Sequence, residues 1–116
     1  MSNAASDGKI DYVEFPAPDA GKCRDFYAGV FGWKFEDYGP TYTSFHDGRI
    51  AGGFAADPVE RPPKPLVVIY AADLEGAQKR IEGAGGKITR AIFSFPGGRR
   101  FHFTDPGGNE LAVWSE

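Results

Sequence analysis

The feature that most constrains the fold is an order of elements that repeats in the two halves of the chain. In each half, an aspartate that can cap a helix is followed 13 positions later by a glycine that can end the helix. The aspartate oxygen accepts from free N–H groups of the first helical turn, and glycine readily adopts the left-handed conformation of a helix end. The two pairs are Asp19 with Gly32 and, 54 residues later, Asp73 with Gly86. This repetition predicts the same strand–helix–three-strand unit twice.

The first half is predicted to begin with a strand at residues 10–15, which ends at prolines that cannot donate to a sheet ladder. A helix follows near residues 20–31, because apolar residues recur there at helical spacing. Short strands are expected at 33–35, 42–45 and 49–55, the last two joined by a turn at His46-Asp47-Gly48. The apolar helical residues are Cys23, Phe26, Tyr27, Val30 and Phe31.

The second half follows the same order after a segment with four prolines, residues 57–65. Strands are predicted at 66–71, 87–93, 101–104 and 110–114, a helix from Leu74 to Ala84, and a loop at 94–98. Arg99 and Arg100 are interpreted as part of a solvated hairpin loop, which could also border the mouth of a ligand pocket, where the arginines would attract an anionic ligand. The predicted organisation is one domain in four parts: a tag or disordered tail at 1–8, a first module at 9–56, a linker at 57–65 and a second module at 66–116.

Charge and composition exclude several classes of function. The net charge is −3 and no run of Lys or Arg forms a basic stripe, so nucleic-acid binding is not expected. The single Cys23 cannot form an intrachain disulfide, and this favours a reducing, cytoplasmic location. No apolar run approaches the ~18 residues of a membrane span, so no membrane partner is expected.

Three segments resemble a known family: Val13-Glu-Phe-Pro-Ala-Pro-Asp19, Phe26-Tyr-Ala-Gly-Val-Phe-Gly-Trp33 and Asp105-Pro-Gly-Gly-Asn-Glu110. Their order is similar to that of the vicinal oxygen chelate superfamily, which includes glyoxalase I, bleomycin resistance proteins and extradiol dioxygenases. The resemblance implies an α+β fold in which two tandem βαβββ modules form curved mixed sheets around a cavity. It also implies a homodimer with the concave sheets or their edges at the interface.

In metal-dependent members of this family, the first and last strands of each module carry the ligands of a divalent ion. The resemblance places these positions at Tyr12, Leu66 and Ala112, with the fourth near Gly52. Leucine and alanine cannot coordinate a cation, and a lone tyrosine binds a divalent ion poorly. We therefore predict that the protein has no metal site and no cofactor.

Two residues are candidates for catalysis, Glu14 and His102. Glu14 lies two positions after Tyr12, so both side chains leave the same face of a strand. A carboxylate among aromatic rings would have a raised pKa and could act as a general base or anchor a ligand, whereas a structural ion pair would explain it equally well. His102 alternates with Phe101 and Phe103, so either the histidine or the phenylalanines face the cavity.

We expect an apolar cavity lined with aromatic residues, suited to a small organic molecule. The leading hypothesis is a metal-free binding protein similar to the bleomycin resistance proteins. One alternative is a metal-independent isomerase or lyase that uses Glu14 or His102 as an acid or base, and another is a non-catalytic dimerising protein. The residues predicted to contact the ligand are Tyr12, Glu14, Tyr42, Leu66, Val68, Tyr70, His102, Ala112 and Trp114.

Overall fold

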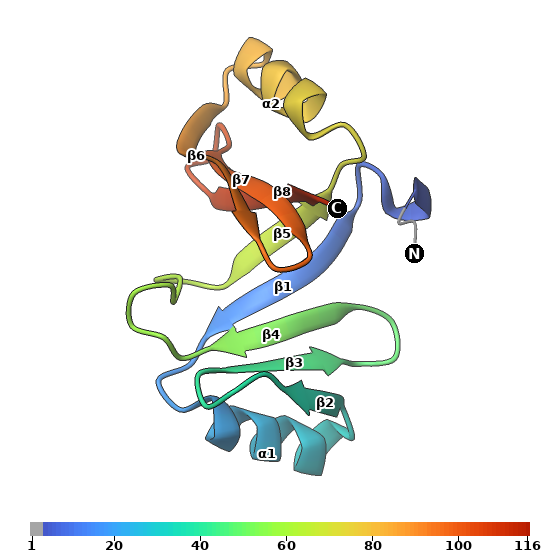
Figure 1. The fold of residues 1–116 in the computed structure, drawn as a ribbon, viewed down its shortest axis with the longest axis vertical. Coiled ribbons are helices and arrows are strands. Elements are labelled where there is room, and N and C mark those ends of the chain that lie inside the picture. The colour runs from blue at the N-terminus through green and yellow to red at the C-terminus, as the bar shows by residue number, and fades with distance from the viewer. Residues whose placement is uncertain (1–3) are drawn as a thin grey trace. The chain divides into compact units, whose positions relative to one another are not determined.

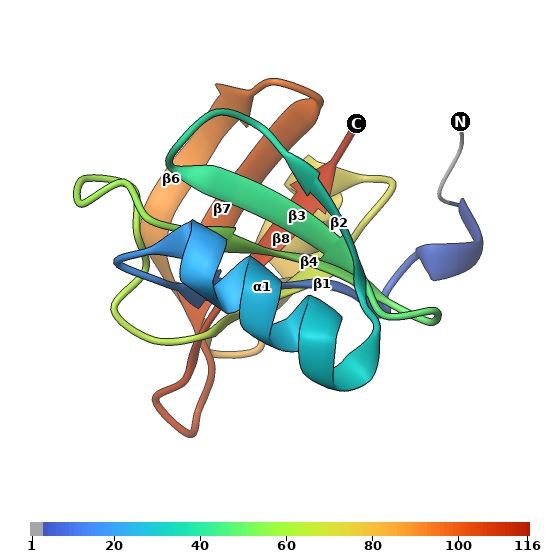
Figure 2. The same cartoon turned by 90° about the horizontal axis from the view of Figure 1, so that it is seen from below.

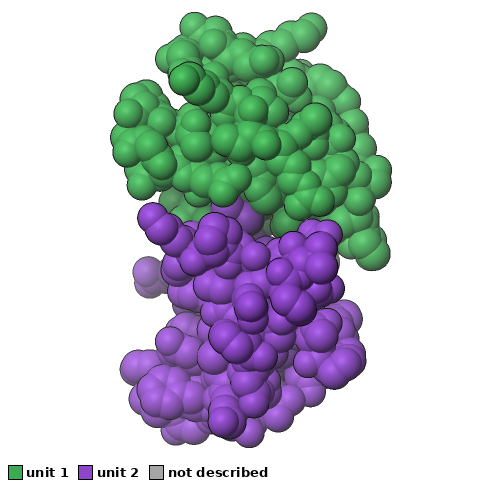
Figure 3. All heavy atoms as spheres, turned by 90° about the vertical axis from the view of Figure 1, so that its left-hand side faces the viewer, with its two compact units in different colours: residues 1–11, 67–116 green, residues 12–66 purple. Residues whose placement is uncertain are grey.

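The computed structural model describes residues 4–116. Its eight strands and two α-helices divide between two compact units, each with one helix and four strands (Figures 1 and 3). Unit 2 comprises residues 12–66, and unit 1 comprises the described residues up to 11 together with 67–116. The predicted α+β class is confirmed, as is the strand–helix–three-strand order of both halves.

Unit 2 is built from the first half of the chain. Its elements are β1 (Ile10–Pro16), α1 (Ala20–Phe31), β2 (Lys34–Asp37), β3 (Tyr42–His46) and β4 (Ala51–Ala55). The strands lie in the order β2-β3-β4-β1, with β1 parallel to β4 and the other pairs antiparallel. Helix α1 packs against one face of these strands (Figure 2). In this contact Tyr27 stacks on Phe54, with ring centroids 5.4 Å apart.

Helix α1 has the bounds and caps predicted from the sequence. The Asp19 carboxylate accepts from the Lys22 amide at 3.1 Å, and Gly32 ends the helix with φ 72°. The predicted apolar face is only partly correct. Tyr27 packs into the core, whereas Phe26 and Phe31 are 57% and 64% exposed. The four short strands can cover only a narrow stripe of the helix, so the rest of its apolar surface remains exposed to solvent.

Unit 1 repeats the arrangement with β5 (Leu66–Tyr70), α2 (Leu74–Gly83), β6 (Lys87–Phe95), β7 (Gly98–Thr104) and β8 (Glu110–Ser115). The strand order is β5-β8-β7-β6, with β5 parallel to β8. Asp73 caps α2 by accepting from the Gly76 amide at 3.0 Å. The core between α2 and the sheet consists of Ala71, Leu74, Ala77, Phe101, Phe103 and Val113.

The loop predicted at 94–98 is wrong. Strand β6 continues to Phe95 and β7 begins at Gly98, so only Pro96 and Gly97 form the turn. Proline favours the first central position of a tight turn, and Gly97 supplies the positive φ, 109°, that the second position needs. Arg99 and Arg100 therefore lie in a paired strand and not in a solvated loop.

Part of the predicted tail at 1–8 falls within the described residues. Ala4–Ser6 forms a 3-10 turn, the Gly8 amide donates to the Tyr70 carbonyl at 2.8 Å, and the Ala72 amide donates to the Asp7 carboxylate at 3.0 Å. These contacts attach residues 7 and 8 to the end of β5. Within residues 4–116, neither helix has the length and apolar character that crossing a membrane requires.

Candidate functional site

Each sheet has one face packed against its helix and one face that the helix does not cover. In unit 2, the uncovered face carries Tyr12, Glu14 and Tyr42, which we call the tyrosine face. Strand alternation explains this placement, because Phe15 and Phe54 pair in register on the helix side and their neighbours point the other way. The predicted residues of this half are therefore brought together.

The three side chains of the tyrosine face form one hydrogen-bonded group. The Tyr12 and Tyr42 hydroxyls are hydrogen-bonded to each other, and the Tyr42 hydroxyl donates to a Glu14 carboxylate oxygen at 3.4 Å. Glu14 is only 7% exposed. Burial, followed by the Tyr12 hydroxyl and the Glu14 carboxylate, raises the pKa of Tyr42 well above its usual value. Tyr42 is consequently a neutral phenol at physiological pH, able to donate or accept a hydrogen bond but not to act as a base.

Gly53 provides the space that this group occupies. It pairs with Glu14 across β1 and β4, and a Cβ at this position would overlap the Tyr42 hydroxyl and crowd the Tyr12 hydroxyl at 2.6 Å. The next residue back, Gly52, lies on the helix side, where a Cβ would overlap the Phe45 ring. The expectation placed the fourth ligand position near Gly52, and of the two glycines only Gly53 lies on the tyrosine face, because register in a strand decides the face.

In unit 1, the uncovered face carries two rows of side chains aligned across the strands, which we call the histidine face. Residues that pair directly across strands point to the same side, so the ladder registers define each row. The row nearer the turn at Pro96 is Tyr70, Trp114, Arg100 and Phe93. The second row is Val68, Ala112, His102 and Arg90.

The open question about His102 is settled by these registers. Phe101 is fully buried on the α2 side, and His102 projects from the opposite face. Its Nδ1 lies 3.5 Å from a carboxylate oxygen of Glu110, and its Nε2 is buried without a hydrogen-bond partner among the described residues. Burial, and next the Arg100 guanidinium, lower the pKa of His102 below its usual value, against an opposing effect of Glu110. His102 is therefore a neutral imidazole at physiological pH.

The aromatic residues of the histidine face have their polar atoms occupied. The Trp114 indole N–H donates to Asp11 at 2.9 Å, and the Tyr70 hydroxyl donates to Glu116 at 2.8 Å. The two rings meet edge to face, with centroids 5.2 Å apart. These contacts fix the rings, which leaves them as apolar surface and not as acid or base groups.

Arg90 was not among the residues that sequence reasoning singled out, and Arg100 was assigned to a loop that could border a ligand pocket. The Arg90 guanidinium lies 3.7 Å from the centroid of the Phe93 ring, and that of Arg100 lies 5.2 Å from the same centroid. Arg99, in contrast, reaches the α2 side and pairs with Glu75 at 2.6 Å. Alternation with His102 could have placed Arg100 on this face, had residues 98–100 been recognised as strand.

The remaining predicted contact residues are aliphatic and buried. Val68 is 3% exposed and Ala112 is fully buried, both in the His102 row. Leu66, at the start of β5, is 3% exposed and belongs to unit 2. His46 is exposed at the end of β3, where its Nδ1 accepts from the Gly48 amide at 3.0 Å. The structure therefore places the predicted residues in two groups, one in each unit.

The residues at the family's ligand positions do not fit a divalent metal ion. Leu66 and Ala112 offer no donor atom, Tyr12 is engaged with Tyr42, and the β4 residue on the tyrosine face is a glycine. Nowhere in the described part of the chain do three or more His, Cys, Asp or Glu side chains gather as potential ligands. The donor set lacks the imidazoles and carboxylates that such an ion requires.

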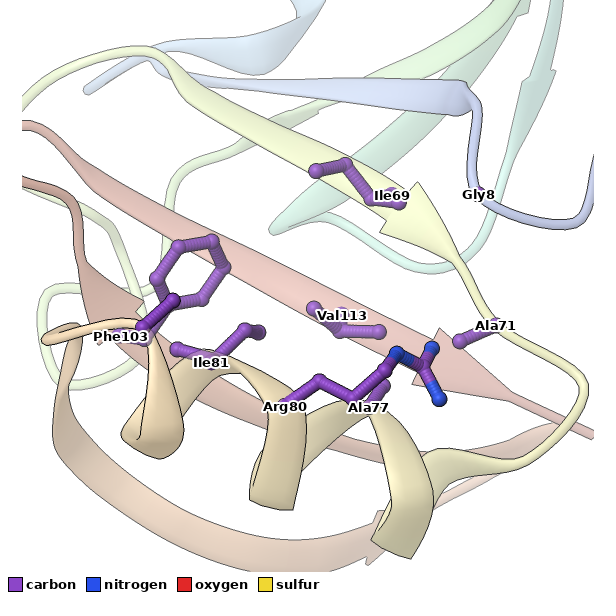
Figure 4. A pocket seen from close by; sticks show the side chains of 9 residues that line it. Gly8, Ile69, Ala71, Ala77, Arg80, Ile81, Phe103 and Val113 are labelled. Atoms are coloured by element: carbon purple, nitrogen blue, oxygen red, sulfur yellow. The ribbon is translucent and has the colours of Figure 1, made fainter.

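A separate pocket lies on the helix side of unit 1, between α2 and the sheet (Figure 4). Its volume is about 270 Å³. The close-up shows Ile81, Phe103 and Val113 lining it, with the Arg80 guanidinium at one end. The small side chains of Ala71 and Ala77 leave this hollow in the core. With one charged group and no converging polar groups, it lacks the orienting contacts of a specific ligand site.

Comparisons with known proteins agree with this architecture. The family model described as Glyoxalase/Bleomycin resistance protein/Dioxygenase superfamily matches residues 9–113. The anthracycline biosynthesis proteins DnrV of Streptomyces peucetius and DauV of Streptomyces sp. (strain C5) are each 31% identical to the chain over 128 residues. Each match covers 92% of this chain and 46% of the relative, so the chain spans about half the length of these curated relatives.

Solved structures show the same fold at lower sequence identity. A glyoxalase/bleomycin resistance protein/dioxygenase superfamily member from Vibrio splendidus 12B01 superimposes with a TM-score of 0.72 at 15% identity, covering 90% of this chain and 97% of that one. Methylmalonyl-CoA epimerase from Mycobacterium tuberculosis gives 0.68 at 14% identity, covering 99% and 92%. The Mn(II)-bound glyoxalase from Novosphingobium aromaticivorans gives 0.68 at 20% identity, covering 95% and 39%.

Proposed function

The chain belongs to the Glyoxalase/Bleomycin resistance protein/Dioxygenase superfamily, and on that premise we propose that it binds a small organic molecule on its uncovered sheet faces without a metal ion. The observation that carries the proposal is the buried, hydrogen-bonded group of Tyr12, Tyr42 and Glu14. Removing a carboxylate from water is costly, and buried titratable groups with perturbed pKa values, such as Tyr42 beside Glu14, gather at functional sites. In this proposal Glu14 anchors a polar group of the ligand.

The test of binding is a thermal-shift screen of metabolites and antibiotics, including anthracyclines because the relatives DnrV and DauV are named for their biosynthesis. A ligand at 100 times its dissociation constant stabilises the folded state by about 2.7 kcal/mol. Such an increase is readily measured as a higher melting temperature. A library in which no compound shifts the melting temperature would count against the proposal.

Glu14→Gln is expected to weaken binding of a ligand found in that screen by about 10- to 100-fold, because a hydrogen bond to a charged group is worth about 1.5–3 kcal/mol. The change keeps the shape of the side chain and removes its charge. Titration calorimetry with both proteins measures the difference. Glu82→Gln, at an exposed position of α2, is the control and should bind like the wild type. Unchanged affinity in Glu14→Gln would remove the anchoring role.

The purified protein is expected to contain no stoichiometric Zn, Ni, Fe or Mn, because the family's ligand positions hold side chains without suitable donors. Elemental analysis after dialysis measures the content. Addition of Zn²⁺ or Mn²⁺ should also leave the melting temperature unchanged, which supplies an independent readout. About one firmly held ion per chain would overturn this part of the proposal.

A metal-independent enzyme is the second candidate, and His102 favours it. A neutral imidazole with an unpaired Nε2 can accept a proton, as a general base must. Isomerase or lyase chemistry would then begin with removal of a proton from the bound molecule, with Glu14 as the alternative base. Turnover of a ligand from the screen distinguishes this candidate from a binding protein, because binding alone returns the ligand unchanged.

A homodimer is part of the proposal, as the family resemblance implies, and a non-catalytic dimerising protein is the third candidate. The proposed interface is formed by the concave sheets or their edges, as the resemblance implies. A reducing, cytoplasmic location is likewise proposed, on the basis of the single cysteine.

A further inference from the structure

The pocket on the helix side of unit 1 takes no part in the proposed function. It lies between α2 and the strands and has a volume of about 270 Å³ (Figure 4). Arg80 and Ala84 line it and are both exposed, so the pocket opens to solvent along that edge of α2. A cavity of roughly 150 Å³ with aliphatic and aromatic walls is already large enough to bind benzene. A small molecule can therefore both reach this pocket and fit within it.

The pocket exists because unit 1 places small side chains where unit 2 places rings. In unit 2, Tyr27 of α1 stacks on Trp33 and Phe54, with ring centroids 4.7 and 5.4 Å away. In unit 1, Ala77 in α2 and Ala84 at its C-cap line the pocket, and each side chain ends at its Cβ. Empty apolar space lacks the contacts that a close-packed core provides. A molecule that fills the pocket would supply these contacts.

The walls of the pocket determine which kind of molecule it suits. Among the described residues that line it, Arg80 carries the one charged side chain, and Figure 4 shows the guanidinium at one end. Within residues 4–116, Arg80 forms no ion pair, since Glu75, also on α2, is held by Arg99 at 2.6 Å. The other side chains that line the pocket are apolar.

A ligand with one anionic end and an aliphatic remainder matches these walls. A planar guanidinium binds a carboxylate through two parallel hydrogen bonds, and the stem of an arginine side chain packs on apolar surface. The pocket has no converging polar groups, so a ligand with several polar groups would lose hydrogen bonds to water without replacement. A molecule with a single polar end avoids this loss, because one contact at the mouth of the pocket satisfies that end.

We propose that the pocket between α2 and the strands of unit 1 binds an aliphatic monocarboxylate, such as octanoate. The alkyl chain lies among Ile81, Phe103 and Val113, and the carboxylate pairs with the Arg80 guanidinium at the exposed end. This site is separate from the tyrosine face and from the histidine face. The inference therefore goes beyond the proposed function and does not depend on it.

Titration calorimetry with butanoate, hexanoate and octanoate tests the alkyl part of the site. Each added methylene group should tighten binding about fourfold, as expected for its transfer from water to an apolar site. Acetate, which has the same head group and only a methyl, should show no measurable binding. Affinity that does not rise with chain length would overturn the inference.

Nuclear magnetic resonance of isotope-labelled protein locates the bound molecule. Octanoate should shift the backbone amide resonances of Ala77, Ile81 and Val113, which line the pocket. It should leave the resonances of Tyr12 and Tyr42 on the tyrosine face in place. Shifts confined to positions outside the pocket would contradict the proposed site, whatever the affinity.

Arg80→Gln tests the contact with the carboxylate. The variant should bind octanoate about fivefold more weakly, the upper range for an exposed ion pair, while the uncharged analogue octanol binds as it does to the wild type. Arg49→Gln makes the same change at an exposed position of unit 2 and should not alter either affinity. Unchanged octanoate affinity in Arg80→Gln would overturn the assignment of a carboxylate ligand.

Ala77→Leu fills the pocket from the α2 side and should abolish octanoate binding. Because the added side chain occupies empty apolar space, the melting temperature should stay at or above that of the wild type. Ala28→Leu, at an exposed position of α1, is the matched control and should bind octanoate normally. Undiminished binding in Ala77→Leu would overturn the inference and leave the proposed function in place. If Ala77→Leu does not fold, the amide shifts of the wild type decide the site.

Discussion

Phe101→Ala is expected to lower the free energy of unfolding by about 3–5 kcal/mol, the range for removing a fully buried aromatic ring from a core. Phe101 is 0% exposed and lies in β7 against α2. Its truncation removes apolar contacts and leaves a cavity that a sheet strand cannot close, since its neighbours are held in register on both sides. Urea denaturation followed by circular dichroism measures the change.

Phe26→Ala is the matched control for this prediction. The same side chain is removed, but from a position on α1 that is 57% exposed. The free energy of unfolding should change by only about 0.5 kcal/mol, as is usual for surface substitutions. Equal losses in the two variants would contradict the core assigned to unit 1.

Gly52→Ala is expected to destabilise unit 2 strongly, by about 3 kcal/mol, the upper end for overpacking a core. The new Cβ would overlap both the Phe45 ring and the backbone carbonyl oxygen of Val13. A ring can rotate, but the carbonyl belongs to the β1–β4 ladder and cannot move without breaking it. Thermal and urea denaturation measure the loss. Stability close to that of the wild type would show that this register is wrong.

Gly53→Ala, one residue further, should affect the site more than the fold. Here the Cβ meets the hydroxyls of Tyr42 and Tyr12, which are the ends of flexible side chains. Displacing them breaks their hydrogen bond and exposes Tyr42, so its pKa should fall towards the usual value. Spectrophotometric titration of the tyrosines measures this fall, and ligand affinity should decrease with it.

Gly29→Ala provides the control for both glycine variants. Gly29 lies within α1, and a Cβ there has no atom within 4 Å. Alanine favours the helix over glycine by roughly 0.5–1 kcal/mol, so this variant should be slightly more stable than the wild type. The three glycine variants each add the same methyl group. They are nevertheless expected to differ in the sign of the stability change and in the property that reports the effect.

The candidate site was only partly predictable. Alternation within one strand correctly placed Tyr12 and Glu14 on one face, because that periodicity is local. Their contact with Tyr42, which is 30 positions from Tyr12 and 28 from Glu14, depends on the β1–β4 and β3–β4 registers. Arg100 was assigned to a loop and not to a strand because the turn was placed over 94–98. Pairing with β8 extends β7 back to Gly98, and that stabilisation is not visible in the local sequence.

The sequence by itself determined the elements that local chemistry controls: the helix caps at Asp19 and Asp73, the two helices, and the repeated strand order that identifies the family. Only the tertiary structure decided which face each strand presents to its helix, and hence that Phe101 is core and His102 is not. The physical reason is that a cap or a helical period is satisfied within a few neighbouring residues. The face that a strand turns towards its helix is determined by pairing with strands far along the chain. A shift of the pairing register by one residue exchanges the two faces.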